Sequence, residues 1–473
     1  MVRTVAERKS PAILEEVESS EFADVRLGAR FRKLVCQLSQ VPGAGLSIAC
    51  EDWANTKAAY RFLSNPRVHE AEILSGHFEA TRRRFQVADE AVLILHDTTE
   101  FSFKRANAEE IGVLKKLPKA DAMRGAYGPK HIKTCGILMH SSLIVTRSGV
   151  PLGLGAVKFW TRDRFKGTNA LKRKINPTRV PIEEKESIRW LENLRQSTAL
   201  LGVPKRCVHI GDRESDIFEL FHAAVDLETH FLVRTCVDRL ACGGETVVSR
   251  KLSQSPVRGF HSVTLPDAEG VARTAKLAIK FMTLEVCPPL YKGTRYPPLV
   301  LTVVEAIEQN PPKGQKPIVW KLLTNLPVRS LADAKEKLRW YAMRWKIETF
   351  HKILKSGCKA EDSRLRSAER LANLFAIFCI LGWRIFWITM LRREIPDAEP
   401  SVAFTSSETA ILARLTHTTQ RMTLHDCILQ VAKLGGYLAR TNDPPPGNIV
   451  MWRGLSRLSD LVLGASLQME SCG

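Results

Sequence analysis

The sequence has no pair of cysteines spaced as CxxC, and its 11 cysteines form an odd set scattered from Cys36 to Cys472. This pattern argues against a disulfide framework and against a zinc site built from cysteines. Several cysteines lie among apolar residues, as Cys135 and Cys379 do, where a free thiol packs as a small hydrophobic side chain. A reducing compartment, the cytoplasm, is the predicted location.

Long apolar runs are also scarce. The N-terminal segment lacks the apolar stretch of a secretory signal. One run, residues 371–391, is long enough to span a bilayer, but Asn373 and Arg384 lie inside it. A membrane span and a helix buried in a large core share this composition. Because the chain has no second run of this kind, we favour the buried helix and predict no membrane partner.

Acidic residues are too few to balance the basic ones. The chain has 50 Asp and Glu against 70 Lys and Arg, which gives a formal net charge of +20. Such an excess favours a polyanionic partner, because each cation laid on a phosphate releases counterions. A ribosome-associated or merely basic protein would show the same balance, so charge alone leaves both interpretations open.

The patterning divides the chain into several regions. Residues 1–85 are predicted to form short helices with exposed Arg and Lys, which suit either a DNA-docking bundle or a structural one. In residues 86–240 strands alternate with helices, which predicts an α/β core with a partly parallel sheet. Residues 241–329 alternate apolar and polar side chains, as antiparallel strands do. Helical patterns return in residues 330–395 and 396–473.

Two aspartates in the α/β region each end an apolar strand. Asp97 closes the run AVLILHD, and Asp212 closes CVHIGD. Because the carboxyl ends of parallel strands face one edge of a sheet, these carboxylates are predicted to share that edge and a divalent cation. For either residue alone, an aspartate that caps the following turn or helix is the simpler interpretation.

A third carboxylate shifts that balance. Residues 339–357, RWYAMRWKIETFHKILKSG, are predicted to form one helix with an apolar face and an open face on which a single glutamate stands among cations and aromatics. The apolar face holds Met343, Ile347, Phe350 and Leu354. The open face holds Tyr341, Arg344, Trp345, Glu348, Lys352 and Lys355. An ordinary ion pair from Glu348 to Lys352 would also explain this carboxylate.

Three carboxylates from two strands and a helix suit a phosphoryl-transfer site. They can hold two divalent ions with open coordination positions, as an in-line displacement at phosphorus requires. Mg²⁺ prefers oxygen ligands, so neither His nor Cys is needed, and Mn²⁺ is expected to substitute. Asp97, Asp212 and Glu348 are therefore the predicted catalytic and metal-binding residues.

With these residues assembled, the sequence resembles the bacterial DDE transposases of the IS-four insertion-sequence family. The helix fits that family's YREK signature at Tyr341, Arg344, Glu348 and Lys355. LILHDTT and IGDRESD resemble its first and second catalytic aspartate segments, and KAAYRFLSNPRV and HSSLIVTRSGVPLGL resemble further family segments.

The resemblance implies a ribonuclease-H-like core in residues 86–240 and 330–395, interrupted by a β-rich insertion at 241–329. It implies a transposon-end DNA-binding domain at 1–85 and a dimerisation region at 396–473, where LGGYLAR is similar to a family helix near the subunit pair. The predicted DNA contacts are Tyr341, Arg344, Lys352, Lys355, Arg213, Arg234, Trp320, Arg26, Arg30 and Arg61. Trp320 resembles a tryptophan that stacks on a flipped base, although a packed strand aromatic would look the same.

The sequence is thus predicted to encode a cut-and-paste DNA transposase in the bacterial cytoplasm, associated with the nucleoid. Its expected partners are double-stranded DNA, as transposon ends and target, and a second copy of the chain in a homodimer. A structure-specific nuclease on the same core would cut without joining. A catalytically silent regulator derived from a transposase would bind the ends without cutting them.

Overall fold

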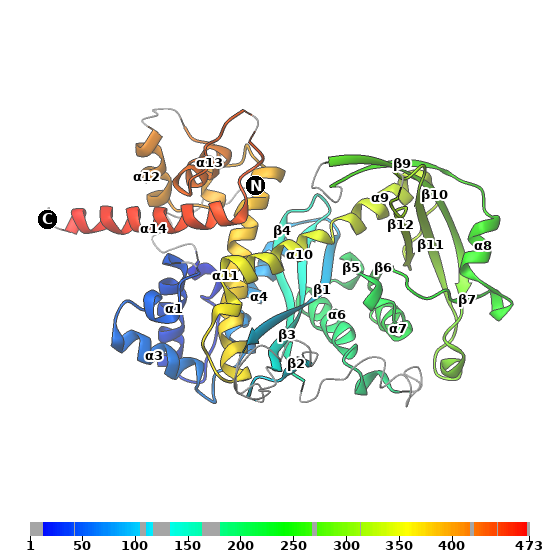
Figure 1. Cartoon of the computed structure of the whole chain (residues 1–473), viewed down its shortest axis with the longest axis horizontal. Coiled ribbons are helices and arrows are strands. Elements are labelled where there is room, and N and C mark those ends of the chain that lie inside the picture. Colours follow the sequence, from blue (N-terminus) through cyan, green and yellow to red (C-terminus); the bar gives the residue numbers. More distant parts are fainter. Residues whose placement is uncertain are drawn as a thin grey trace, which may run out of the picture.

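The computed structural model describes residues 13–41, 43–104, 110–116, 133–162, 180–266, 272–312, 314–416, 421–441 and 443–470. Helices lie at both ends of the chain and flank a mixed sheet in its middle (Figure 1). This arrangement confirms the prediction of an α/β protein with helical regions at both ends. It also places the N-terminal and C-terminal helices together at one end of the molecule and the β-rich segment at the other (Figure 1).

The centre of the sheet has the strand order β4-β3-β1-β5-β6. The strands are β1 (Val92–Lys104), β3 (Lys133–Thr146), β4 (Pro151–Trp160), β5 (Cys207–Gly211) and β6 (His230–Arg234), and β2 (Val113–Lys116) also pairs with β3. β3 runs antiparallel to both of its neighbours β1 and β4, whereas β5 runs parallel to β1 and β6 parallel to β5. The predicted partly parallel sheet is therefore present, with its parallel half beginning at β1.

β1 is longer than the sequence predicts. It was expected to end at Asp97, yet it continues to Lys104 and stays paired with β3 throughout. Residues after Asp97 keep the two-residue alternation, with Phe101 and Phe103 buried on one face. On its other side, β1 pairs with β5 only as far as Leu95, so Asp97 does lie just beyond the end of that parallel pairing, as predicted.

The sheet continues from β6 into the β-rich segment. β12 (Val319–Thr324) pairs antiparallel with β6, and from there the order runs through β11 (Leu299–Glu308), β10 (Ala272–Val286), β7 (Leu240–Ala241) and β8 (Thr246–Val247), while β9 (Gly259–Pro266) pairs with β10. β9 to β12 are antiparallel, as their alternating pattern indicates. α8 (Val248–Gln254) packs beside this part of the sheet (Figure 1).

Helices cover both faces of the central strands. α6 (Ile188–Leu201) and α7 (Phe218–Asp226) pack on one face, where Trp190 of α6 lies 6.1 Å from His96 of β1, measured between ring centroids. α11 (Ala368–Glu394) packs on the other face, with Phe375 4.5 Å from Phe101. Because successive strand residues point to opposite faces, Asp97 faces the α11 side and its neighbours His96 and Thr98 face α6.

α11 contains the apolar run that could be mistaken for a membrane span. Among the described residues it is the one helix long and apolar enough to cross a bilayer, and 89% of its most apolar window is buried inside the protein. Trp383 and Phe386 are fully buried, and Asn373 donates to the carbonyls of Leu63 and Val68. The prediction of a buried core helix is confirmed.

The helix predicted over residues 339–357 is tightened near its middle. α9 (Leu331–Ala342) is followed by α10 (Trp345–Lys352) and a π-turn, η9 (Ile353–Gly357), and the backbone N–H groups of Arg344, Lys346 and Ile347 bond three residues back rather than four. A stretch with three-residue bonding rises more per residue than an α-helix, and it rotates the residues before it relative to those after it. Tyr341 is consequently buried, which corrects its expected place on the open face.

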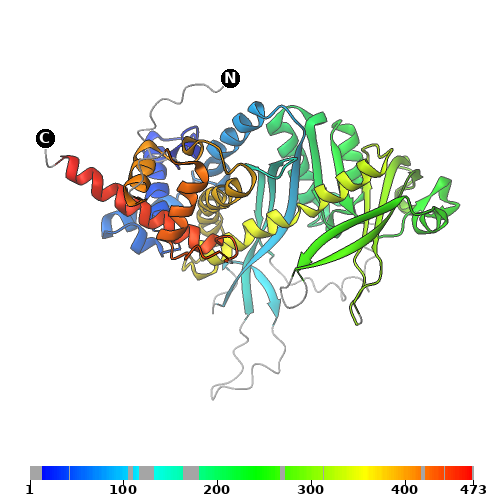
Figure 2. The ribbon, with the colours of Figure 1, turned by 90° about the horizontal axis from the view of Figure 1, so that it is seen from above.

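The remaining helices form the two ends. The N-terminal helices are η1 (Leu14–Glu16), α1 (Val25–Gln40), α2 (Leu46–Ala49), α3 (Trp53–Leu63) and α4 (Glu70–Val87). The C-terminal helices are α12 (Ser406–Thr416), α13 (Leu424–Leu434) and α14 (Asn448–Glu470). α14 packs along α11, α12 and α13 and extends outward past them (Figures 1 and 2).

A buried ionic cluster fastens the N-terminus to the core. The Glu16 carboxylate accepts from Arg84 at 2.7 and 3.0 Å and from His77 Nδ1 at 2.6 Å. His77 Nε2 accepts the backbone N–H of Leu154 on β4, so its proton is on Nδ1 and the ring is neutral. Burial alone would raise the pKa of Glu16, but Arg84 and His77 lower it to about 2.

Glu16→Gln is expected to lower the free energy of unfolding by about 3 kcal/mol, because it removes the buried carboxylate that pairs with the partly buried Arg84. The pKa of Glu16 is lower in the folded protein than its ordinary value of 4.5. Its contribution is therefore complete above that value and is lost as the pH falls toward about 2. Urea titrations at about pH 7 and about pH 3 should show a smaller difference between wild type and variant at the lower pH. A pH-independent difference would contradict this account, and Glu18→Gln, at an exposed position, is the control.

Candidate active site

The register of two parallel strands brings Asp97 and Asp212 to the same edge. Leu95 of β1 lies opposite Ile210 of β5, and each aspartate follows its residue by two positions. Asp97 is inside β1, whereas Asp212 caps the short helix η6 (Arg213–Ser215) and accepts the backbone N–H of Glu214 at 2.9 Å. Asp212 therefore has the capping role that its sequence context allowed, with its second carboxylate oxygen left to other partners.

The third carboxylate comes from α10, which crosses the sheet over β1 (Figure 2). The Glu348 carboxylate forms an ion pair with Arg344, which lies one helical turn earlier. The same guanidinium lies 3.9 Å from Oδ2 of Asp97, measured from Nη1. Arg344 therefore stands between the two carboxylates. The Glu348 side chain is 52% exposed, whereas that of Asp97 is 17% exposed.

A histidine that the sequence reasoning missed also supports Asp97. His351 follows Glu348 by three residues on α10, and its Nδ1 lies 3.7 Å from Oδ2 of Asp97. Its Nε2 lies 2.8 Å from the hydroxyl of Ser141, which is opposite Asp97 on β3. Burial lowers the pKa of His351 to about 3, with Lys355 and Arg344 adding to the effect, so the ring is neutral. The i,i+3 spacing from Glu348 was a signal for this residue.

The electrostatics of the site favour a cation. Burial raises the pKa of Asp97 to about 7, and the charges of Asp212 and Glu348 add to this effect while Arg344 opposes it. Asp212 and Glu348 therefore both lie within electrostatic reach of Asp97. A carboxylate in such surroundings gains a partner either by taking a proton or by binding a positive ion.

The donor set suits a hard divalent ion, although its present arrangement is not closed around one. Among the described residues, no three His, Cys, Asp or Glu side chains are gathered closely enough to hold a metal ion. Glu348 is turned to Arg344 instead. Mg²⁺ prefers oxygen ligands, and Asp97, Asp212 and Glu348 would each supply carboxylate oxygens.

The other predicted contacts in the core fall into two groups. Lys352 is exposed on α10, and the ammonium of Lys355 lies 5.8 Å from the centroid of the Phe101 ring. Arg213 is exposed in η6, directly after Asp212.

A second group lies where β6 meets β12. Arg234 donates to the carbonyl of Val319 at 2.8 Å, and the neighbouring indole of Trp320 packs edge-on against Tyr341, with 5.6 Å between ring centroids. Trp320 is half-buried. Through Tyr341, three residues before Arg344, this aromatic pair adjoins the carboxylate site.

The three N-terminal arginines differ in their surroundings. Arg61 is exposed on α3. Arg26 is 91% exposed and pairs with Asp24 at 3.0 Å. Arg30 bonds the side chain and the carbonyl of Asn55, and so ties α1 to α3. Arg30 therefore has a structural role, because it holds α1 against α3. Its position on a basic helix did not indicate that role.

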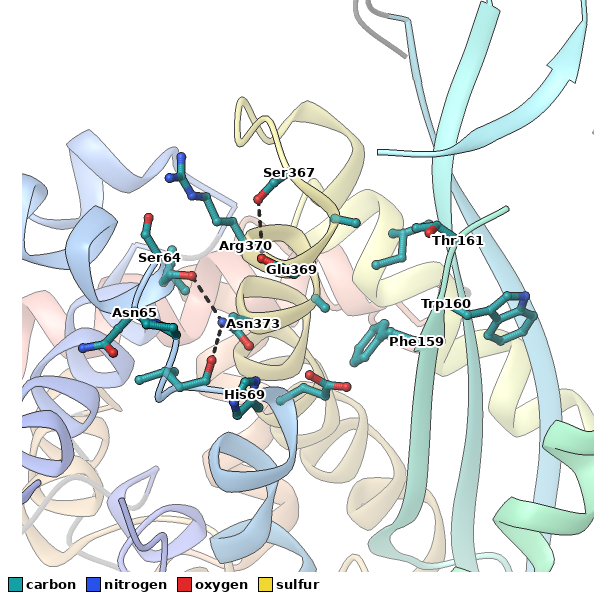
Figure 3. A pocket seen from close by; sticks show the side chains of 17 residues that line it. Ser64, Asn65, His69, Phe159, Trp160, Thr161, Ser367, Glu369, Arg370 and Asn373 are labelled. Atoms are coloured by element: carbon teal, nitrogen blue, oxygen red, sulfur yellow. Dashed lines mark hydrogen bonds between the residues drawn. The ribbon is translucent and has the colours of Figure 1, made fainter. Parts of the chain in front are cut away.

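A sizeable cavity lies away from the carboxylates. A pocket of about 560 Å³ lies between the α3–α4 turn, the end of β4 and the start of α11 (Figure 3). Asn65, His69, Thr161 and Arg370 contribute polar groups to it, but none of the three predicted carboxylates lines it. The chemistry of the site, rather than cavity size, identifies the candidate active site.

Comparison with protein families places the N-terminal helices. Residues 10–68 match the family described as transposase DNA-binding, and this segment contains α1, α2 and α3. The match and the net charge of +20 together support a DNA-binding protein. More particularly, the match supports a transposase, with DNA as its partner.

Proposed function

We propose that this protein is a metal-dependent DDE transposase that binds the inverted ends of its element, cuts them and joins them to target DNA. The observation that carries the proposal is the register that brings Asp97 and Asp212 to one edge of the sheet, with Glu348 linked to Asp97 through Arg344. It occurs in a chain whose N-terminal segment matches transposase DNA-binding domains. Neither observation alone would suffice, because carboxylates also cap helices and DNA-binding segments also occur in regulators.

The strand order supports a ribonuclease-H-like core for this site. Three antiparallel strands, β4, β3 and β1, are continued by two strands parallel to β1; Asp97 lies on β1, and Asp212 directly follows the neighbouring strand β5. The segment from β7 to β12 enters after β6 and returns to the core at α9. We assign it as the β-rich insertion of the IS-four family.

We assign Asp97, Asp212 and Glu348 as the ligands of Mg²⁺, for which Mn²⁺ would substitute. The ion would supply an activated water or 3′-hydroxyl and would stabilise the leaving oxygen. In this structure the positive charge between Asp97 and Glu348 is the guanidinium of Arg344. Glu348 would have to turn from Arg344 to join the ligands of the ion, and Arg344 would then be free to bind a phosphate.

The surrounding residues position the DNA. Neutral His351, itself held by the hydroxyl of Ser141, lies beside the Asp97 carboxylate and supports it without adding charge. Lys352, Lys355 and Arg213 are available to the phosphates on either side of the cut. Trp320 offers an aromatic face to an unstacked base once it separates from Tyr341, and Arg234 borders the same position.

The complete reaction that we propose reuses one site. A first strand is nicked by water, the freed 3′-hydroxyl attacks the opposite strand to make a hairpin, and the reopened end is joined to target DNA. Two ends must be held together for this, so we propose a homodimer paired through the C-terminal region, in the bacterial cytoplasm at the nucleoid. A nuclease would stop after cutting, and a silent regulator would bind without cutting.

A cleavage assay on wild-type protein tests the proposal. The substrate is duplex DNA that carries the end of the protein's own element, and reactions contain Mg²⁺, Mn²⁺ or EDTA. We expect a strand break at the element boundary with either metal and none with EDTA. Binding of the end without a break under any metal condition would favour the silent regulator.

A further inference from the structure

A buried arginine on the opposite face of the sheet contacts both aspartate-bearing segments. Arg189, near the start of α6, is 8% exposed. Its Nε donates to the hydroxyl of Thr98 at 3.1 Å, and its Nη2 donates to the Glu214 carboxylate at 2.6 Å. Thr98 follows Asp97 on β1, and Glu214 lies two residues after Asp212.

These bonds form a continuous path between the two aspartates. The backbone N–H of Glu214 donates to the Asp212 carboxylate, and its side chain is held by Arg189. Thr98 is held on a second side by His140, whose Nδ1 lies 2.9 Å from the hydroxyl. The path runs from Asp97 through Thr98, Arg189 and Glu214 to Asp212.

Arg189 is itself held firmly. Its Nη1 donates to the carbonyl of Glu186 at 2.9 Å, and its guanidinium carbon lies 5.3 Å and 5.9 Å from the ring centroids of Trp160 and Trp190. Trp190 is fully buried beside it on α6. A guanidinium fixed on several sides transmits the position of one bonded segment to the other, because its planar fork allows little rearrangement.

We propose that Arg189 is a positioning residue that sets the separation of Asp97 and Asp212 from behind the sheet. This inference rests on the proposed function, since the separation matters for a shared metal ion. Glu214, which Arg189 holds, is a direct hydrogen-bond partner of Asp212, and loss of such partners of metal ligands commonly changes metal affinity by about 10–100-fold. Loss of Arg189 should therefore weaken metal binding while leaving DNA-end binding by the N-terminal helices unchanged.

The test uses the 473-residue chain with Mn²⁺ as the probe, and metal binding is measured by electron paramagnetic resonance without DNA. Arg189→Met is expected to weaken Mn²⁺ binding by about 10–100-fold, and Arg189→Lys to restore only part of it. Hydrogen exchange in the segment 207–216 should accelerate in Arg189→Met, since Glu214 is released. Arg206→Met is the matched control, because Arg206 stacks on Phe85 and bonds the carbonyl of Glu90 away from the aspartates.

A second, milder variant tests the same inference if Arg189→Met does not fold. The Glu214 side chain is 61% exposed, so Glu214→Gln should fold, and it should reproduce part of the loss of Mn²⁺ affinity. Where Arg189→Met also folds, adding Glu214→Gln to it should have no further effect, because both changes break one path. Unchanged Mn²⁺ affinity in Arg189→Met, or in Glu214→Gln when the first variant does not fold, would overturn the inference. Absence of Mn²⁺ binding in wild type, or binding unaffected by Asp97→Asn, would instead count against the proposed function.

Discussion

Asp97→Asn, Asp212→Asn and Glu348→Gln are each expected to reduce end cleavage in Mg²⁺ by about 1,000-fold or more. Metal ions supply several kcal/mol of transition-state stabilisation, and each tenfold in rate corresponds to about 1.4 kcal/mol. An amide keeps the shape of the carboxylate but removes the charge that holds the ion. Binding of the DNA end should remain, because the N-terminal helices and the surrounding cations are unchanged.

The measurement pairs a single-turnover cleavage assay with a gel-shift assay on the same DNA end. Glu336→Gln is the control carboxylate, since Glu336 lies on α9 and pairs with Arg147 and Lys337 away from the site. A variant at Asp97, Asp212 or Glu348 that cleaves at the wild-type rate in Mg²⁺ would remove that residue from the metal site. Loss of DNA binding together with cleavage would show a structural role instead.

Trp320→Ala is expected to leave first-strand nicking intact and to slow hairpin formation by about 10–100-fold. Bending a strand back at a blunt end forces a base out of the stack, and an indole face recovers about 1–3 kcal/mol by stacking on it. Trp320 packs edge-on against Tyr341 and is only half-buried, so we expect one face of its indole ring to be accessible to a base. A nicked intermediate should therefore accumulate.

A time course on denaturing gels separates nicked, hairpin and opened products. Trp320→Phe is the conservative variant and should lie between wild type and Trp320→Ala, because it keeps a smaller ring. If nicking and hairpin formation slow in parallel in Trp320→Ala, the residue supports the fold of β12 and takes no part in base stacking.

The sequence predicted the architecture well where periodicity is strong. The apolar runs before Asp97 and Asp212 became adjacent parallel strands, and the long run at 371–391 became a buried helix. The antiparallel strands of the β-rich segment followed from alternation. In each case one local pattern was enough, since burial of one or both faces determines it.

The parts that sequence could not predict depend on contacts between distant segments. Arg189 is 91 residues from Thr98, and Arg30 is 25 residues from Asn55, so neither bond has a local signal. The buried position of Tyr341 depends on a tightened turn at residues 343–347, which a uniform helical period does not anticipate. The ion pair between Arg344 and Glu348 follows from i,i+4 spacing, but its closeness to Asp97 required the sheet.

Joining of cut ends to a second DNA distinguishes a transposase from both a nuclease and a silent regulator. Wild-type protein is incubated with DNA that carries both ends of its element, a circular target and Mg²⁺, and the products are sequenced across the junctions. We expect hairpin intermediates and element ends joined to the target, all absent in Asp97→Asn. Cut ends that never form a hairpin or a junction would contradict it and identify a nuclease, whereas bound but uncut ends would identify a regulator.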